Sequence, residues 1–199
     1  MDKYSNNVRL IGVISTGFEF VKDFYGEKIY EFTLAISRLS GTIDYIPVQV
    51  SNRTMDVSKY SIGDRVCIDG EFRSHVAFLD EKRRLILNLF ALKVATTDLP
   101  DDNSIIMRGN ICKTPVYRVT PKGKEVCDIL LAMNVNIKSW YIPCIAWGRN
   151  AGYLADMEVG TNIEFTGRIQ SRNFTKDGVE RIAYEVSVMG IREDFEDED

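Results

Sequence analysis

The chain has 199 residues, of which 45% are hydrophobic, enough for one or two globular domains with cores of their own. No stretch approaches the roughly 20 apolar residues of a membrane span, and residues 1–5 lack the apolar core of a signal peptide, so we expect a cytoplasmic protein. The net charge of −4 comes from residues 193–199, which carry six acids, since residues 1–97 hold 13 basic and 12 acidic side chains and residues 98–192 hold 12 and 11.

Related sequence occurs twice in the chain, 97 residues apart. Gly12, Ala35, Gly63 and Gly70 return as Gly109, Ala132, Gly160 and Gly167. A period of this length is that of a small domain and exceeds the unit of a solenoid, so the sequence predicts two copies of one fold. We expect a first domain over residues 1–95, a polar, turn-rich linker over 96–104, a second domain over 105–192 and an acidic tail over 193–199.

Alternating apolar and polar residues, typical of half-buried strands, predict five strands in each half. In the first half they cover about 8–14, 29–37, 44–50, 64–74 and 84–94, and in the second about 105–111, 126–134, 140–147, 161–173 and 181–191.

Two intervening segments, residues 51–62 and 149–159, have apolar spacing closer to that of a helix. They end at Gly63 and Gly160, and glycine suits the end of a helix because it accepts a positive φ. A short helix between strands three and four of a five-stranded all-β domain is the order of an OB fold. The sequence therefore predicts two tandem OB-fold (five-stranded Greek-key) barrels, with another small barrel or sandwich as the alternative.

The third strand of the second copy carries large rings on its predicted outer face. Ile142, Cys144 and Ala146 alternate toward the core, which leaves Tyr141, Ile145 and Trp147 on the opposite face, with Trp140 just before them. Rings exposed to water need a reason, and stacking on the bases of a single-stranded nucleic acid supplies one. The alternative is that Trp147 packs between domains and that Tyr141 contacts a second copy.

Basic residues lie in the segments around these rings. On the fourth strand Ile169 points inward, which places Arg168, Gln170 and Arg172 outside, and Phe174 leads into a hairpin turned by Asp177-Gly178. The first loop of this copy adds a cationic set with one ring, Tyr117, and its basic members are Arg118, Lys122 and Lys124. Cations that follow phosphates, interleaved with rings, indicate a single-strand binding surface, although such a loop can also be plain solvated surface.

The first copy offers a poorer surface of the same kind. Its third strand keeps Tyr45 but has Ser51 where the second copy has Trp147, and its fourth strand carries Arg73 and His75. We therefore expect this half to bind nucleic acid more weakly or to have a mainly structural role.

The second half resembles the bacterial single-stranded-DNA-binding protein family over nearly all of residues 105–191. The matching text is IMRGN at 106–110, PVYR at 115–118, TPKG at 120–123, IAWGRNA at 145–151 and FTGRIQSR at 165–172. The resemblance implies OB folds, DNA wrapping, no catalysis, and base-stacking positions at Tyr141, Trp147, Phe174 and Ile137. It also implies four OB domains in a working unit, which a homodimer of this tandem-OB chain would supply.

These observations predict a single-stranded DNA-binding protein that holds or protects DNA during replication, recombination or repair, with a nucleoid-associated place in the cytoplasm. Rings stack bases at Tyr141, Trp147, Phe174, Trp140 and Tyr45, and cations meet phosphates at Arg118, Lys122, Lys124, Arg149, Arg168, Arg172 and Arg73. RNA remains open as a ligand. The alternative function is a protein-interaction module of a replication or recombination assembly with weak DNA affinity.

An enzyme and a metalloprotein are both disfavoured. His75 is the only histidine, and Cys67, Cys112, Cys127 and Cys144 lack paired metal-ligand spacing, so we expect reduced cysteines and no cofactor.

Overall fold

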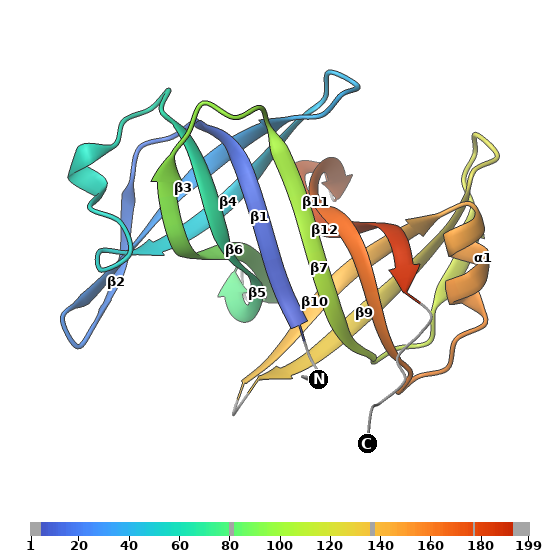
Figure 1. The fold of residues 1–199 in the computed structure, drawn as a ribbon. Helices are drawn as coiled ribbons and strands as arrows, with labels where there is room; N and C mark the ends of the chain where they lie inside the picture. The colour runs from blue at the N-terminus through green and yellow to red at the C-terminus, as the bar shows by residue number, and fades with distance from the viewer. Residues whose placement is uncertain (1–4, 80–81, 136–137, 177, 193–199) are drawn as a thin grey trace. The chain divides into compact units, whose positions relative to one another are not determined.

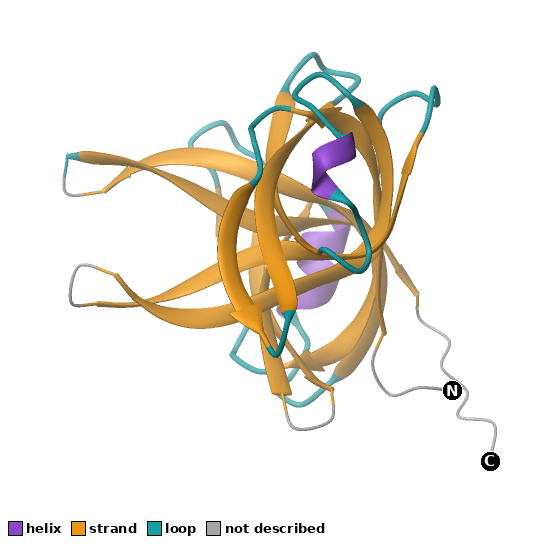
Figure 2. Ribbon diagram, turned by 90° about the vertical axis from the view of Figure 1, so that its left-hand side faces the viewer, coloured by secondary structure: helices purple, strands orange, loops and turns teal. Residues whose placement is uncertain are grey.

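The computed structural model describes residues 5–79, 82–135, 138–176 and 178–192. The chain forms two compact units. We call residues 7–104 with 170–183 the first unit, and residues 105–169 with the described ends 5–6 and 184–192 the second unit. Strands make up most of the described chain, as Figure 2 shows. Within that described part, no helix is both long and apolar enough to cross a membrane.

The first copy of the repeat forms strands β1 (Ser5–Ile14), β2 (Glu19–Phe24), β3 (Glu27–Ser37), β4 (Ile43–Ser51), β5 (Arg65–Leu79) and β6 (Lys82–Thr96). They are hydrogen bonded in the order β2-β3-β4-β6-β5-β1, and a further pairing of β3 with β1 closes the barrel (Figure 1). The β4–β6 pair is parallel, and the other pairs whose registers are known here are antiparallel. Leaving out β2, this is the five-stranded barrel of an OB fold.

The second copy repeats the arrangement with β7 (Asp102–Ile111), β8 (Val116–Val119), β9 (Glu125–Val135), β10 (Lys138–Trp147), β11 (Asn162–Lys176) and β12 (Val179–Arg192). The order is β7-β11-β12-β10-β9-β8, with a β7–β9 pairing that closes the barrel and a parallel β10–β12 pair. The predicted fold, two tandem OB barrels, is confirmed. The middle of the β11–β12 hairpin, residues 170–183, belongs to the first unit.

The alternation seen in the sequence is the alternation of burial in the barrels. In β4, Asp44, Ile46, Val48 and Val50 are fully buried, and in β9 the inward Leu131 and Met133 are too. All ten predicted strands exist. Strands β2 and β8 were not predicted, because every residue of these short edge strands is exposed and no apolar period marks them.

The predicted helices are only partly realised. The second copy has the seven-residue helix α1 (Arg149–Ala155), whereas the first has only the one-turn 3-10 helix η1 (Val57–Lys59). Gly63 and Gly160 do have positive φ, but they do not end these helices. Their N–H groups donate to the carbonyls of Ile14 and Ile111, at 2.9 and 2.7 Å, so each turn is joined to the end of the first barrel strand.

The predicted linker is anchored to the first barrel. The N–H of Ser37 donates to Asp101 at 2.7 Å, and the Arg65 guanidinium pairs with the same carboxylate. Burial alone would raise the pKa of Asp101, but these hydrogen bonds and the Arg65 charge outweigh burial and lower that pKa below its usual value.

Candidate nucleic-acid interface

Strand β10 presents two rings to solvent. Tyr141 is 42% exposed and Trp147 is 40% exposed, while Ile142, Cys144 and Ala146 between them are buried. A strand turns successive side chains to opposite faces, so the odd-numbered positions point away from the core. The exposed rings are therefore placed where an extended strand of nucleic acid would have access to their flat faces.

Two neighbouring residues depart from the predicted arrangement. Trp140 is only 7% exposed, because it alternates in phase with Ile142 and Cys144 and lies on the core side. The structure therefore does not present Trp140 as a stacking ring. Ile145, expected on the outer face, is buried as well.

Trp147 shares an open surface pocket of about 620 Å³ with the β8–β9 loop. Its other lining residues are Val119, Gly123, Lys124, Glu125 and Gly148. The loop is held by backbone bonds, since the Thr120 N–H donates to the Lys124 carbonyl at 2.8 Å and the Gly148 N–H donates to the Glu125 carbonyl at 3.0 Å. A cation and a flat ring thus lie at one pocket, the combination that a nucleotide requires.

The basic side chains of this loop differ in how readily they could bind a phosphate. Lys122 and Lys124 are exposed. Arg118 forms two hydrogen bonds with Asp128, at 2.9 and 3.3 Å, in an exposed pair. To bind a phosphate, the Arg118 guanidinium would have to give up a hydrogen bond to Asp128 or bind both groups at once.

Tyr117, which the sequence placed in the basic first loop but which we did not include among the stacking rings, is exposed on β8. Its hydroxyl donates to Glu125 at 2.6 Å, and that hydrogen bond raises the pKa of the Tyr117 hydroxyl above its usual value. Its position in the first loop was the signal that could have identified it.

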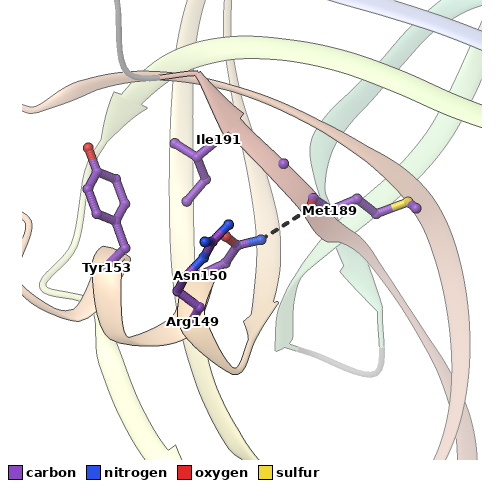
Figure 3. A pocket seen from close by; sticks show the side chains of 6 residues that line it. Arg149, Asn150, Tyr153, Met189 and Ile191 are labelled. Atoms are coloured by element: carbon purple, nitrogen blue, oxygen red, sulfur yellow. Dashed lines mark hydrogen bonds between the residues drawn. The ribbon is translucent and has the colours of Figure 1, made fainter.

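Arg149 lies at a second pocket, of about 450 Å³, between the start of α1 and the end of β12 (Figure 3). Asn150, Tyr153, Met189, Gly190 and Ile191 complete its lining. The Asn150 amide donates to the Met189 carbonyl at 3.2 Å and ties the helix to the strand. Sequence reasoning selected Arg149 but not its neighbour Asn150, nor Tyr153, which lies one helical turn further along α1.

The predicted residues on β11 fall into both units. Arg168 is half-buried in the second unit, whereas Arg172 and Phe174 belong to the first unit. The Arg172 guanidinium carbon lies 5.8 Å from the centre of the Phe174 ring, which is within cation–π range. Ile137, Asp177 and the acidic tail 193–199 lie outside the described residues.

The strand registers establish which positions of the two barrels correspond. Tyr45 pairs with Ala35 as Tyr141 pairs with Ala132, so these two tyrosines are equivalent. By the same registers Ser51, opposite Ile29, corresponds to Trp147, opposite Val126. Tyr45 is 46% exposed, but Ser51 is buried. The first barrel thus keeps one ring of the pair and has lost the other.

Arg73, chosen from the sequence as a phosphate contact, is already occupied. Its guanidinium donates to Glu71 at 2.6 and 2.9 Å and lies 3.9 Å above the Phe90 ring. An arginine held between a carboxylate and a ring has less charge to offer a phosphate.

Among the described residues, no group of three or more His, Cys, Asp or Glu side chains is placed to hold a metal ion. All four cysteines are free thiols, and burial raises the pKa of Cys144 far above its ordinary value.

The chain is similar to known proteins in its second half. The profile of the single-strand binding protein family matches residues 102–193. Single-stranded DNA-binding protein 3 of Streptococcus agalactiae is 33% identical over 88 residues, covering 40% of this chain and 64% of that protein. Single-stranded DNA-binding protein 1 of Streptococcus pyogenes is 30% identical over 88 residues, covering 40% of this chain and 68% of that protein. The chain spans about half to two thirds of the length of the curated relatives named first.

A solved structure matches the whole chain. The single-stranded DNA binding protein from Thermus aquaticus superposes with a TM-score of 0.80 at 20% identity, covering 98% of this chain and 95% of that one. This likeness supports the tandem-barrel fold.

Proposed function

Because this chain belongs to the single-strand binding protein family, we propose that it binds single-stranded DNA through base stacking and phosphate contacts. One observation carries the proposal more than any other. The exposed ring of Trp147 and the exposed cation of Lys124 line the same open pocket, and the Tyr141 ring lies on the same strand. Stacking contributes about 1–3 kcal/mol for each base, and it tolerates any base because every base has a flat face.

The second barrel is proposed as the principal binding surface. Tyr141 and Trp147 stack bases, and Lys122, Lys124 and Arg149 neutralise phosphates along the exposed loop and helix start. The first barrel contributes less through β4 and β5, since Ser51 on β4 is buried where Trp147 is exposed and Arg73 on β5 is engaged by Glu71.

The proposed role is to hold or protect single-stranded DNA during replication, recombination or repair, without catalysis. Stacking faces do not read the sugar, so RNA binding is an outcome to measure beside DNA. We further propose a homodimer that assembles four barrels, a cytoplasmic location, and a domain division at the linker 96–104. Proteins of replication or recombination are proposed as further partners.

Titration with oligo-dT tests the proposal directly. Trp140 is buried and Trp147 is exposed, so a stacked base should quench the emission of Trp147 and leave a constant background from Trp140. Trp147→Phe should remove most of the quenching while the chain still binds. The affinity should fall steeply with added salt, because cations on the protein displace counterions from the DNA.

Binding that is indifferent to salt, or absent altogether, would count against the proposal. Retention of a replication protein from solution without any DNA binding would instead favour the interaction module.

A further inference from the structure

Strand β4 begins with an edge that β6 does not cover. The parallel register between them joins Val48, Gln49 and Val50 to β6, whereas β4 starts at Ile43. Edge N–H groups at the start of such a strand need another acceptor. The N–H of Tyr45 finds one in the Ser171 hydroxyl, at 3.2 Å, although 126 residues separate them in sequence.

A buried carboxylate strengthens this contact. Asp44 is fully buried, and its Oδ1 accepts from the Ser171 N–H at 2.9 Å and from the Ser171 hydroxyl at 3.4 Å. Arg38 compensates the charge with two hydrogen bonds of 2.6 and 2.5 Å to the same carboxylate. The bond to Asp44 raises the pKa of the Arg38 guanidinium, so Arg38 stays charged throughout the ordinary pH range. Buried charges held this way resist separation, because either partner alone would be left without compensation.

A cation, Arg172, and a ring, Phe174, lie close to Ser171 on the same strand. Ser171, Arg172 and Phe174 are consecutive or nearly so on β11, and all belong to the first unit with Tyr45. Three residues of extended strand span about 10 Å, so Phe174 lies a short distance along β11 from the bond to Tyr45. The Arg172 guanidinium is already beside the Phe174 ring, at 5.8 Å from its centre.

We propose that Tyr45, Arg172 and Phe174 form one composite contact for single-stranded DNA, which we call the hairpin site. The hairpin of the second copy thereby supplies the first barrel with a second stacking ring, which β4 itself lacks because Ser51 stands where the second copy has Trp147. Ser171 and Asp44 are positioning residues that hold the two halves of the hairpin site together. The inference depends on the proposed function. It goes beyond that function by identifying the part of the chain that completes the binding surface of the first barrel.

The ligand class follows from the side chains. Two rings stack bases and one guanidinium meets the phosphate between them, and neither kind of contact depends on the identity of the base. The about 10 Å of β11 between Ser171, which bonds to Tyr45, and Phe174 is short compared with the length of the roughly 4–16 nucleotides that one OB fold binds. A single stretch of DNA can therefore contact both rings.

A double-mutant cycle on the full chain tests the hairpin site, with anisotropy of a labelled oligo-dT as the measurement. Y45A and F174A should each weaken binding about fivefold or more. Y45A/F174A should weaken it by clearly less than the product of the two, because the same stretch of DNA is released by either change. The control pair Y45A/W147A, which combines residues of different units, should show the simple product. A simple product for Y45A/F174A would overturn the inference.

The positioning role has a separate test. S171A should weaken oligo-dT binding in the wild-type background but have no further effect in Y45A/F174A, and S171T should retain wild-type affinity because it keeps the hydroxyl. An S171A effect of equal size in both backgrounds would contradict the positioning role.

Two outcomes separate this inference from the proposed function. If W147L weakens binding while Y45A and F174A do not, the hairpin site fails and the proposed function stands. If the wild-type chain does not bind oligo-dT, both fail.

Discussion

Replacing Trp147 by Leu removes the largest exposed ring of β10 and keeps an apolar side chain against the barrel. Trp147 is 40% exposed. An aromatic side chain of this size presents up to about 250 Å², so about 100 Å² is open to a stacked base. At about 25 cal/mol for each Å², covering that area contributes about 2.5 kcal/mol.

This area estimate is an upper value, because a base covers one face of the ring and leucine still offers some contact. Alanine substitutions at other stacking sites give about 1–3 kcal/mol. We therefore expect a loss of about 1–2.5 kcal/mol, which is about 5- to 60-fold in Kd.

The assay is anisotropy of a fluorescently labelled oligo-dT, since the change removes the tryptophan that would otherwise report binding. Ser51→Ala is the matched control, because Ser51 occupies the equivalent register position in the first barrel and is buried. S51A removes an acceptor for the Arg53 N–H, at 3.1 Å, and should leave Kd nearly unchanged. Thermal unfolding of both variants checks that the barrels remain intact.

A W147L protein that unfolds normally and binds oligo-dT as tightly as wild type would refute the stacking argument. The same conclusion would follow if S51A weakened binding as much as W147L.

Four further predictions concern charge and packing. Lys124→Ala should make the negative slope of log K against log salt shallower by about 0.7, the value for one phosphate contact on a single strand. An unchanged slope would show that Lys124 does not contact a phosphate. Gly167→Ala should destabilise the chain by about 1–3 kcal/mol in urea unfolding, since its new Cβ would lie 2.4 Å from the Ser187 carbonyl oxygen. Gly152→Ala on α1 has open space and should stabilise it by about 0.5–1 kcal/mol; equal effects from the two changes would contradict the packing argument. Asp101→Asn should lower stability at neutral pH. Because the folded-state pKa of Asp101 is depressed, its stabilisation is complete above the ordinary value of 3.8 and disappears as the pH falls through the folded-state pKa, so the curves of D101N and wild type should converge in acid rather than stay parallel.

Part of the candidate site was visible in the sequence because burial in a barrel strand alternates. That period placed Tyr141 and Trp147 outside and Ile142 inside, as the structure has them. The same rule, applied without exception, would have assigned Trp140 to the core. Ile145 shows the limit of the rule, because a side chain on the outer face can still be covered.

Charge was harder to predict than apolar burial. Arg73 and Arg118 looked like phosphate contacts, but Glu71 and Asp128 bind them in the folded chain. Glu71 is two residues from Arg73, whereas Asp128 is ten residues from Arg118 and reaches it only because β8 pairs with β9. Net charge is a sum over the sequence, but the charge available to a ligand depends on which partners lie within a few ångströms.

The sequence by itself determined the duplication, because related residues return 97 positions later. It also determined the ten barrel strands and the outward rings of β10, because burial in a strand follows the local alternation of apolar and polar residues. Only the tertiary structure decided that Ser171 bonds to Asp44 and Tyr45 and so brings a hairpin of the second copy into the first unit. The physical reason is that a hydrogen bond between residues 127 positions apart leaves no period or motif in the chain. It depends on an open strand edge and a buried carboxylate, which exist only after the barrel has closed.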